Sequence, residues 1–315
     1  MRSGGRLIVA VDSVYAWSAT AINSYNRFSG NLQWSFPAPG KGFDVSVAYA
    51  NGVVYAASQP DITSGAPLLY ALNATTGTMV WKQKIASFSG WPLVVADGTV
   101  YYTDFARHLV AVHATTHKVK WKFKAHDELT RPAIANGTVY VGSFDHKLYA
   151  LNEATGAKQW TFNAHDEIFA SASIANGLVY AGQRSGTMYA VDATTGKLRW
   201  KFQTGGTYTT DAAIANGNIY FGSNDNSVYA LNATTGKLAW TFATGNVVDT
   251  TPVVANGVLY VSSTDKNLYA LNASTGGKLL TTFTGVAALV NVVVSQGNVF
   301  IGLATGHLRR FTLPD

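Results

Sequence analysis

Short apolar runs alternate with turn residues along the whole chain, and residues 251–283 show the pattern most clearly. Asn256-Gly257 is a dipeptide that closes two-residue hairpins, and Gly276 supplies a positive φ in a later turn. β-Branched and aromatic residues fill the apolar runs, and turns recur roughly every 8–12 residues. No long stretch shows the 3.6-residue period of a helix. The pattern therefore predicts four short antiparallel strands, at 252–255, 258–262, 268–272 and 278–283.

The same unit recurs about every 40 residues, which is typical of repeated supersecondary structure. One aromatic register contains Tyr15, Tyr55, Tyr101, Tyr140, Tyr180, Tyr220, Tyr260 and Phe300. A second register contains Trp34, Trp81, Trp121, Trp160, Trp200 and Trp240, with Leu280 at the seventh position. Four strands per repeat favour a β-propeller blade over a two-helix repeat. We therefore predict an all-β, eight-bladed β-propeller of four-stranded antiparallel blades, forming a single domain over residues 1–315.

The last repeat is incomplete. The expected blades span residues 6–36, 45–85, 91–124, 131–163, 171–203, 211–243, 251–283 and 290–315. The eighth has three expected strands before Asp315, and a fourth strand would have to come from upstream of Leu7. Since an open sheet edge leaves backbone groups unpaired, we expect either a three-stranded last blade or a truncated N-terminus. An insertion at 59–67 predicts a protruding loop in the second blade.

Two segments carry a family resemblance. Tyr189–Trp200 reads Tyr-Ala-Val-Asp-Ala-Thr-Thr-Gly-Lys-Leu-Arg-Trp, and Tyr229–Trp240 is nearly the same. These repeats closely resemble those of pyrroloquinoline-quinone-like (quinoprotein-type) eight-bladed propellers, and the resemblance covers essentially the whole chain. In that family each repeat Trp docks between blades against an Ala of the third strand and the turn Gly. By position, the resemblance implies docking of the six Trp residues against Ala71, Ala111, Ala150, Ala190, Ala230 and Ala270.

The docking scheme also implies a weak seam. Leu280 replaces the Trp of the seventh blade, and Arg310 stands where the eighth blade should have its small Ala. The first blade has Ser24 at that position. We therefore expect the seams around the seventh, eighth and first blades to be the weakest.

Composition narrows the functional classes. Apolar residues make up 47% of the chain and charged residues only 13%, which predicts a folded globular chain and not a disordered one. The net charge of +6 comes from scattered residues and forms no basic stripe, so no nucleic-acid partner is expected. One run, Lys118, Lys120, Lys122 and Lys124, alternates with apolar residues on an expected outer strand. We interpret it as a solvated edge that resists aggregation, with an anionic partner as the alternative.

Targeting signals and cysteines are absent from the sequence. No run of 18 apolar residues is present, so no membrane insertion is expected. Residues 1–5 lack an apolar signal-peptide region, and we interpret the start as that of an excised domain. The absence of Cys excludes disulfides and thiolate metal sites. Few unbroken apolar surface runs favour a monomer.

A duplicated acidic loop is the candidate metal site. Ala-His-Asp-Glu occurs in two consecutive inter-blade loops, as His126, Asp127 and Glu128, and again as His165, Asp166 and Glu167. Imidazole and carboxylate groups together can bind a divalent metal. Because the spacing is that of the repeat, a duplicated, solvent-exposed polar loop is the favoured interpretation.

The inner strands supply a candidate ligand site at the channel mouth. Their first positions are Arg6, Ser46, Pro92, Arg131, Ser171, Asp211, Thr251 and Asn291. Asp44, Asp249 and Tyr208 lie near them in sequence. This mixed polar set, above all Arg131, Asp211, Asp249, Asp44 and Tyr208, suits a small polar ligand, although ordered water is the favoured occupant. A separate acidic set, Asp104, Asp145, Asp225 and Asp265, is expected to cap turns.

The functional hypothesis is a non-enzymatic interaction, sensor or scaffold module with a protein partner and no cofactor. The resemblance points to roles at the bacterial or archaeal cell envelope and favours a periplasmic or extracellular location. Branches of the family include a lipoprotein scaffold of outer-membrane barrel assembly and extracellular sensor domains of kinases. The alternatives are a dehydrogenase dependent on pyrroloquinoline quinone (PQQ) with calcium, and a small polar ligand binder at the channel mouth.

Overall fold

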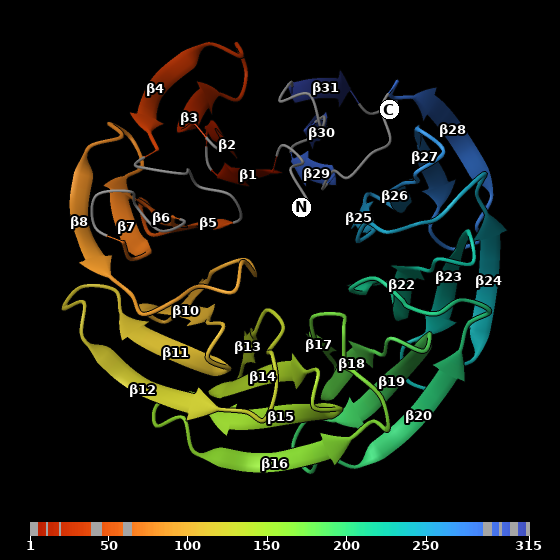
Figure 1. The fold of residues 1–315 in the computed structure, drawn as a ribbon. Helices are drawn as coiled ribbons and strands as arrows, with labels where there is room; N and C mark the ends of the chain where they lie inside the picture. Colours follow the sequence, from red (N-terminus) through yellow and green to blue (C-terminus); the bar gives the residue numbers. More distant parts are fainter. Residues whose placement is uncertain are drawn as a thin grey trace. The chain divides into compact units, whose positions relative to one another are not determined.

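The computed structural model describes residues 6–10, 12–18, 20–38, 46–58, 65–285, 292–295, 298–302 and 308–312. Every regular element in this part of the chain is a β-strand, and the strands pair antiparallel in chain order (Figure 1). The chain forms two compact units, residues 1–131 with 154–156 and residues 132–153 with 157–315. No helix among the described residues is long and apolar enough to cross a membrane.

Unit 1 contains three four-stranded sheets, called blades 1, 2 and 3. Blade 1 is β1 (Arg6–Ala10), β2 (Ser13–Trp17), β3 (Ala21–Asn26) and β4 (Leu32–Pro37). Blade 2 is β5 (Ser46–Ala50), β6 (Val53–Ala57), β7 (Leu68–Asn73) and β8 (Met79–Lys84). Blade 3 is β9 (Val94–Ala96), β10 (Thr99–Thr103), β11 (His108–His113) and β12 (Val119–Lys124). The first strands of neighbouring blades, β1 with β5 and β5 with β9, contact each other.

Unit 2 contains four four-stranded sheets, called blades 4 to 7, and a three-stranded C-terminal sheet. Blade 4 is β13 (Ala133–Ala135), β14 (Thr138–Ser143), β15 (Lys147–Asn152) and β16 (Lys158–Asn163). Blade 5 is β17 (Ser173–Ala175), β18 (Leu178–Gly182), β19 (Thr187–Asp192) and β20 (Leu198–Gln203). Blade 6 is β21 (Ala213–Ala215), β22 (Asn218–Gly222), β23 (Ser227–Asn232) and β24 (Leu238–Ala243). Blade 7 is β25 (Val253–Ala255), β26 (Val258–Ser262), β27 (Asn267–Asn272) and β28 (Lys278–Phe283).

The predicted number of blades is wrong. Seven four-stranded blades are present among the described residues, whereas an eight-bladed propeller with an incomplete last blade was expected. The last repeat forms only β29 (Val292–Ser295), β30 (Asn298–Gly302) and β31 (Leu308–Thr312). In the described part of the chain no fourth strand pairs with this sheet. A single domain over residues 1–315 stays a prediction.

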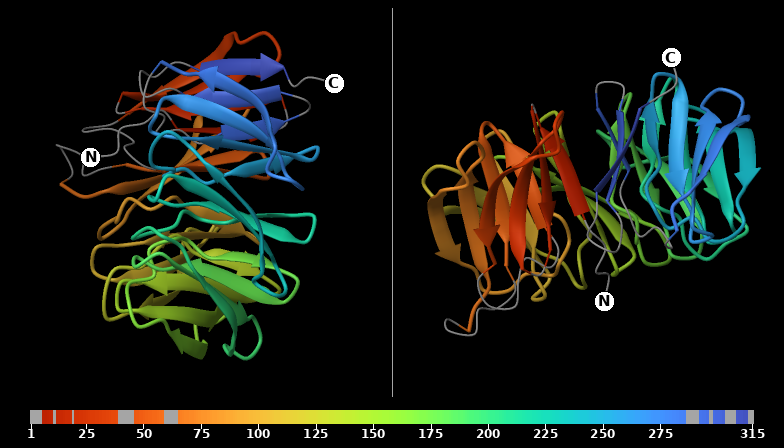
Figure 2. Two further views of the ribbon diagram at one scale, coloured as in Figure 1. Left: turned by 90° about the vertical axis from the view of Figure 1, so that its right-hand side faces the viewer. Right: turned by 90° about the horizontal axis from the view of Figure 1, so that it is seen from above.

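Local turn chemistry sets the strand boundaries within each blade. In blade 7, Asn256 (φ 50°) and Gly257 (φ 76°) are both left-handed, as a two-residue hairpin between twisted strands requires. The hairpin pairs Ala255 with Val258, and this register is repeated at the same place in blades 3 to 6. A bulge follows the Ala of the third strand in blades 2 to 7. Figure 2 shows the strands of each blade running back and forth between two sets of turns.

In blades 1, 2, 4, 5 and 6 the repeat Trp attaches its blade to a turn of the following one. Trp200 donates its Nε1 hydrogen to the carbonyl of Ala233 (2.9 Å), which also accepts the hydroxyl of Tyr180 (3.1 Å). The two rings lie 5.8 Å apart, and both side chains are buried. The same indole bond joins Trp34 to Ala74, Trp81 to Ala114, Trp160 to Ala193 and Trp240 to Ala273.

A glycine with positive φ lies against five of the repeat Trp side chains. A Cβ added to Gly236 would stand 2.6 Å from Cδ2 of Trp200, which is too close for any side chain. Gly77, Gly156, Gly196 and Gly276 meet Trp34, Trp121, Trp160 and Trp240 in the same way. Docking of each indole against the Ala of the third strand stays a prediction, and Ala190 lies in the same buried cluster as Trp200. Ala190 pairs with Trp200 across two strands of the same sheet, and the following blade supplies a carbonyl and a glycine.

The buried tyrosines predict a steep loss of stability in alkali. Burial raises the pKa of Tyr180 to about 12, and it raises the pKa of nine other tyrosines (Tyr15, Tyr55, Tyr102, Tyr140, Tyr149, Tyr189, Tyr229, Tyr260 and Tyr269). An unfolded chain loses these protons near pH 10, before the folded chain does. The free energy of unfolding should therefore be unaffected below pH 10 and should fall progressively from pH 10 to 12.

Urea unfolding at pH 8, 10, 11 and 12, with tyrosinate absorbance recorded in parallel, checks this expectation. Tyrosinate absorbance should rise together with unfolding, and the Tyr180→Phe variant should lose less stability between pH 10 and 12. Equal stability at pH 9 and pH 11.5 would contradict it.

Candidate functional site

The loops that follow each fourth strand and the turns between second and third strands lie at the same end of the blades, because the strands are antiparallel. In unit 2 this end carries a row of three half-buried aromatic rings. Phe144 follows β14, and its ring stacks on Phe169 of the next loop at 5.9 Å with an interplanar angle of 13°. Tyr208 continues the row at 5.8 Å from Phe169. We call Phe144, Phe169 and Tyr208 the aromatic row.

Carboxylates outnumber basic groups around the aromatic row. The turns and loops at this end of blades 4 to 7 contain Asp145, Asp166, Glu167, Asp211, Asp225, Asp249 and Asp265, against Lys147, Arg184 and Lys266. Glu167 and Arg184 form an ion pair of 2.7 Å, and this contact raises the pKa of the Arg184 guanidinium. Asp211 accepts a hydrogen bond from the Ser171 amide at 2.7 Å. The end is acidic although the whole chain carries a net charge of +6.

The acidic turns also connect neighbouring blades. Asp225 caps its own turn by accepting from the Ser227 amide, as expected, and its Oδ2 accepts from the Tyr229 hydroxyl (2.6 Å). The same oxygen accepts from the amide of Gly205, in the loop before blade 6 (2.9 Å). Asp265 repeats all three contacts. The Tyr four residues after each Asp was the sequence signal for this second role, and sequence analysis overlooked it.

Asp104 caps its own turn as expected, but it lies at another position of the repeat than the other acidic turn residues. It lies three residues after Tyr101, whereas Asp145 lies five residues after Tyr140. Its position is that of Ser143, Ser223 and Ser263 in other blades. The Asp104 carboxylate is buried and accepts from the His108 amide at 2.8 Å.

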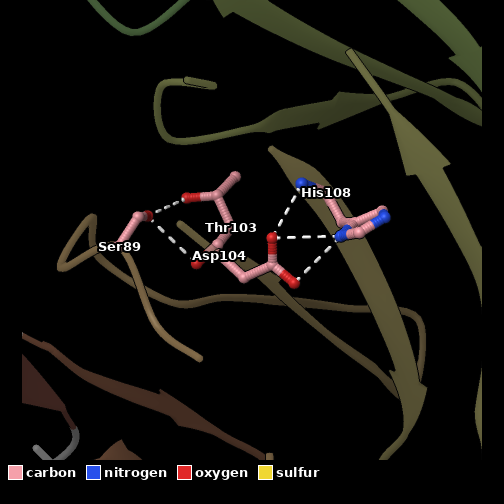
Figure 3. Close-up of polar contacts among 4 residues, drawn as sticks. All are labelled: Ser89, Thr103, Asp104 and His108. Atoms are coloured by element: carbon pink, nitrogen blue, oxygen red, sulfur yellow. Dashed lines mark hydrogen bonds and ion pairs between the residues drawn. The ribbon is translucent and has the colours of Figure 1, made fainter. Parts of the chain in front are cut away.

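The side chains of Asp104 and His108 in blade 3 form a pair (Figure 3). Nδ1 of His108 lies 3.2 Å from both carboxylate oxygens, and the imidazole is partly exposed. Burial and the neighbouring Asp104 charge raise the pKa of Tyr102. Ser89 bonds to Thr103, with 2.7 Å between the hydroxyls. The four residues of Figure 3 thus form two separate pairs, and not a Ser–His–Asp relay.

The two Ala-His-Asp-Glu copies lie in different units. In unit 1, Asp127 Oδ1 accepts from the Glu128 amide, and Arg107 donates to the His126 carbonyl. In unit 2, Asp166 makes the equivalent bond to the Glu167 amide. Within the described ranges, no three His, Asp or Glu side chains form a group that could hold a metal ion. Metal binding by the six loop residues stays a prediction.

The channel-mouth candidates are likewise divided. Arg131 belongs to unit 1, whereas Tyr208, Asp211 and Asp249 belong to unit 2. Asp44 lies outside the described residues. A small polar ligand at these positions stays a prediction.

The lysine run lies on the outer strand of blade 3. Lys120, Lys122 and Lys124 are exposed and Trp121 between them is buried, as alternation predicts. Val119 is also exposed (44%), which contradicts its expected inward orientation. It precedes the bulge in the pairing of β11 with β12, which breaks the alternation.

Comparison with known proteins decides the family. Residues 18–160, 67–201, 145–247 and 236–314 match the family model described as outer membrane protein assembly factor BamB. The chain belongs to this family. The predicted pyrroloquinoline-quinone-like propeller repeat is thereby confirmed.

Solved structures confirm the β-propeller fold. BamB from Moraxella catarrhalis has a TM-score of 0.82 and 21% identity, covering 98% of this chain and 94% of that one. The computationally designed Ika8 protein has a TM-score of 0.85 and 14% identity, covering 99% and 97%. A tetrathionate hydrolase of Acidithiobacillus ferrooxidans is 28% identical over 107 residues, which is 33% of this chain. That match spans only 20% of the hydrolase.

Proposed function

We propose that the protein is a non-enzymatic interaction scaffold of the cell envelope. The observation that carries the proposal is the loop end of unit 2, where the aromatic row lies among an excess of carboxylates. Partly exposed aromatic side chains combine a large apolar area with little flexibility, and they are enriched in protein interfaces. The family supports the proposal, because its description names outer membrane protein assembly.

The envelope location is part of the same proposal. A periplasmic or extracellular site agrees with a family described by assembly at the outer membrane. The absence of cysteine from the sequence suits any redox compartment.

Site-specific photo-crosslinking in cells of the source organism tests the proposal. A photoreactive residue at Thr207, exposed beside the aromatic row, should yield one discrete adduct. The same residue at Thr235, exposed in the turn at the opposite end of blade 6, is the matched control and should yield none. Equal adducts at both positions, or none at Thr207, would contradict the proposal.

The aromatic row should determine the yield of this adduct. In the Thr207 background, Phe169→Ala should reduce crosslinking about tenfold, as expected for loss of an aromatic contact near an interface centre. The exposed Leu238, on the outer strand of blade 6, provides the control variant Leu238→Ala, which should leave the yield unchanged. Melting curves of both variants show whether the fold is kept. An undiminished yield with Phe169→Ala would assign the interface to other residues.

A further inference from the structure

The turn between the third and fourth strands is capped differently in blade 3. In other blades an Asn or Asp oxygen accepts hydrogen bonds from the backbone amides two and three residues later. The capping residues are Asn26, Asn73, Asp192, Asn232 and Asn272. In blade 3 the cap is His113, whose Nδ1 faces the amides of Thr115 (3.2 Å) and Thr116 (3.3 Å).

This geometry makes Nδ1 of the His113 ring a hydrogen-bond acceptor. Both neighbours of Nδ1 are N–H donors, so Nδ1 must present a lone pair and the ring proton must lie on Nε2. Protonation would turn Nδ1 into a third donor facing two others. The amide oxygen of an Asn cap keeps its acceptor role over the range in which histidines change charge. Hydrogen bonds from Thr195 lower the pKa of Asp192, so that cap also stays an acceptor over this range. Among the described caps, only that of blade 3 can therefore be switched off by a proton in the range in which histidines change charge.

The same turn receives the indole of the preceding blade. Trp81 donates its Nε1 hydrogen to the carbonyl of Ala114, the residue directly after His113 (3.1 Å). His117 occupies the place of the docking glycine with φ of 60°, and its ring centroid lies 4.4 Å from that of Trp81. Trp81 is only half-buried, whereas Trp34, Trp200 and Trp240 are buried. The attachment of blade 2 to blade 3 thus depends on a turn with a histidine at each end.

We propose that His113 makes this turn a proton-sensitive contact between blades 2 and 3. In its neutral form the imidazole holds the amides of Thr115 and Thr116 and so fixes the carbonyl that accepts from Trp81. In its charged form both bonds are lost, the turn opens more often, and Trp81 is held less firmly. Acidification would therefore loosen the contact between blades 2 and 3, while the contacts at Asn-capped turns stay unchanged.

The charged groups around the turn are few. Lys118 directly precedes β12, Lys120 lies on β12, and Lys82 lies next to Trp81 on β8. Asp97 lies in the hairpin whose Gly98 carbonyl accepts from the Ala114 amide (2.8 Å). All four side chains are exposed, and Lys120 also bonds to Thr99. His117 would have the opposite effect to His113 on acidification. A charged His117 imidazole beside Trp81 would gain a cation–π attraction and hold the indole more firmly. Variants must therefore separate the two histidines.

Amide hydrogen exchange followed by NMR at pH 7.5 and 5.5 tests the proposal in the intact chain. Thr234 and Thr235, capped by Asn232, are the internal reference for Thr115 and Thr116. In the wild type, protection of Thr115 and Thr116 relative to this reference should fall about tenfold on acidification, as expected for loss of a hydrogen-bond pair. In the His113→Asn variant, which copies the other caps, the ratio should stay constant.

The outcomes decide between the two histidines. The His117→Gly variant should keep the acid-induced fall, because it leaves the His113 cap in place. A constant ratio in the wild type, or an equal fall in His113→Asn, would overturn the proposal. Loss of the fall in His117→Gly would assign the proton sensitivity to His117 and would equally overturn it.

Discussion

The Trp200→Ala variant is expected to lose about 3–5 kcal/mol of unfolding free energy, the range for truncation of a buried large aromatic side chain. Trp200 is buried beside Tyr180, and its Nε1 donates to the Ala233 carbonyl of the next blade. Truncation removes the indole from the boundary between two sheets and opens a cavity there. The loss is larger than that of an exposed residue because the indole is buried. No backbone ladder joins the two blades, so side chains such as this indole hold them together.

Urea unfolding followed by circular dichroism measures this loss. Leu198→Ala is the control, because Leu198 lies on the same strand and is 45% exposed, and it should change stability by less than about 0.5 kcal/mol. Trp200→Phe should fall between the two, since it keeps an aromatic ring but cannot donate to Ala233. A loss below about 1 kcal/mol for Trp200→Ala would show that the indole does not hold the blades together.

The Gly236→Ala variant is expected to lose about 3 kcal/mol, an unusually large effect for one added methyl group. Gly236 has φ of 69°, which costs an L-residue about 1 kcal/mol. The added Cβ would lie 2.6 Å from Trp200 Cδ2, so the indole would have to move, at about 1–3 kcal/mol for overpacking. Two costs that arise separately at other positions coincide at this glycine.

Gly217 separates the two costs. Its φ is 76°, yet a Cβ there would meet nothing within 4 Å, so Gly217→Ala should lose only about 1 kcal/mol. In the Trp200→Ala background the indole is absent, and Gly236→Ala should then cost no more than Gly217→Ala. Equal losses for Gly236→Ala and Gly217→Ala in the wild-type background would contradict the docking geometry.

The sequence was sufficient to predict the strands of each blade, because their determinants are local. In blade 7 the expected strands 252–255 and 258–262 agree with β25 and β26 to within one residue. Their ends are set by Asn256-Gly257, which is adjacent in sequence. The count of eight blades was wrong because a complete blade in the last repeat would depend on a strand from a distant part of the chain. The backbone carbonyl that accepts each indole hydrogen was also not predictable, since every residue has a backbone carbonyl.

The candidate site was less predictable. Asp104 was grouped with the other acidic residues because it lies in the same turn of the repeat, and its different distance from Tyr101 was not considered. Its pairing with His108 was therefore missed. The stacking of Phe144 on Phe169 joins a turn and a loop that no periodicity relates. The cap at His113 could have been found, because it is a His at a position that other repeats fill with Asn or Asp.

The central claim is that this propeller of the BamB family binds a protein partner rather than a quinone. Thermal unfolding with PQQ and calcium, each alone and together, tests it directly, combined with a dye-reduction assay in the presence of alcohols and sugars. A scaffold predicts an unchanged midpoint with every addition and no dye reduction. A quinone enzyme predicts stabilisation that needs both additives, of about 2.7 kcal/mol at a hundredfold excess over Kd, together with dye reduction, and that result would contradict the scaffold.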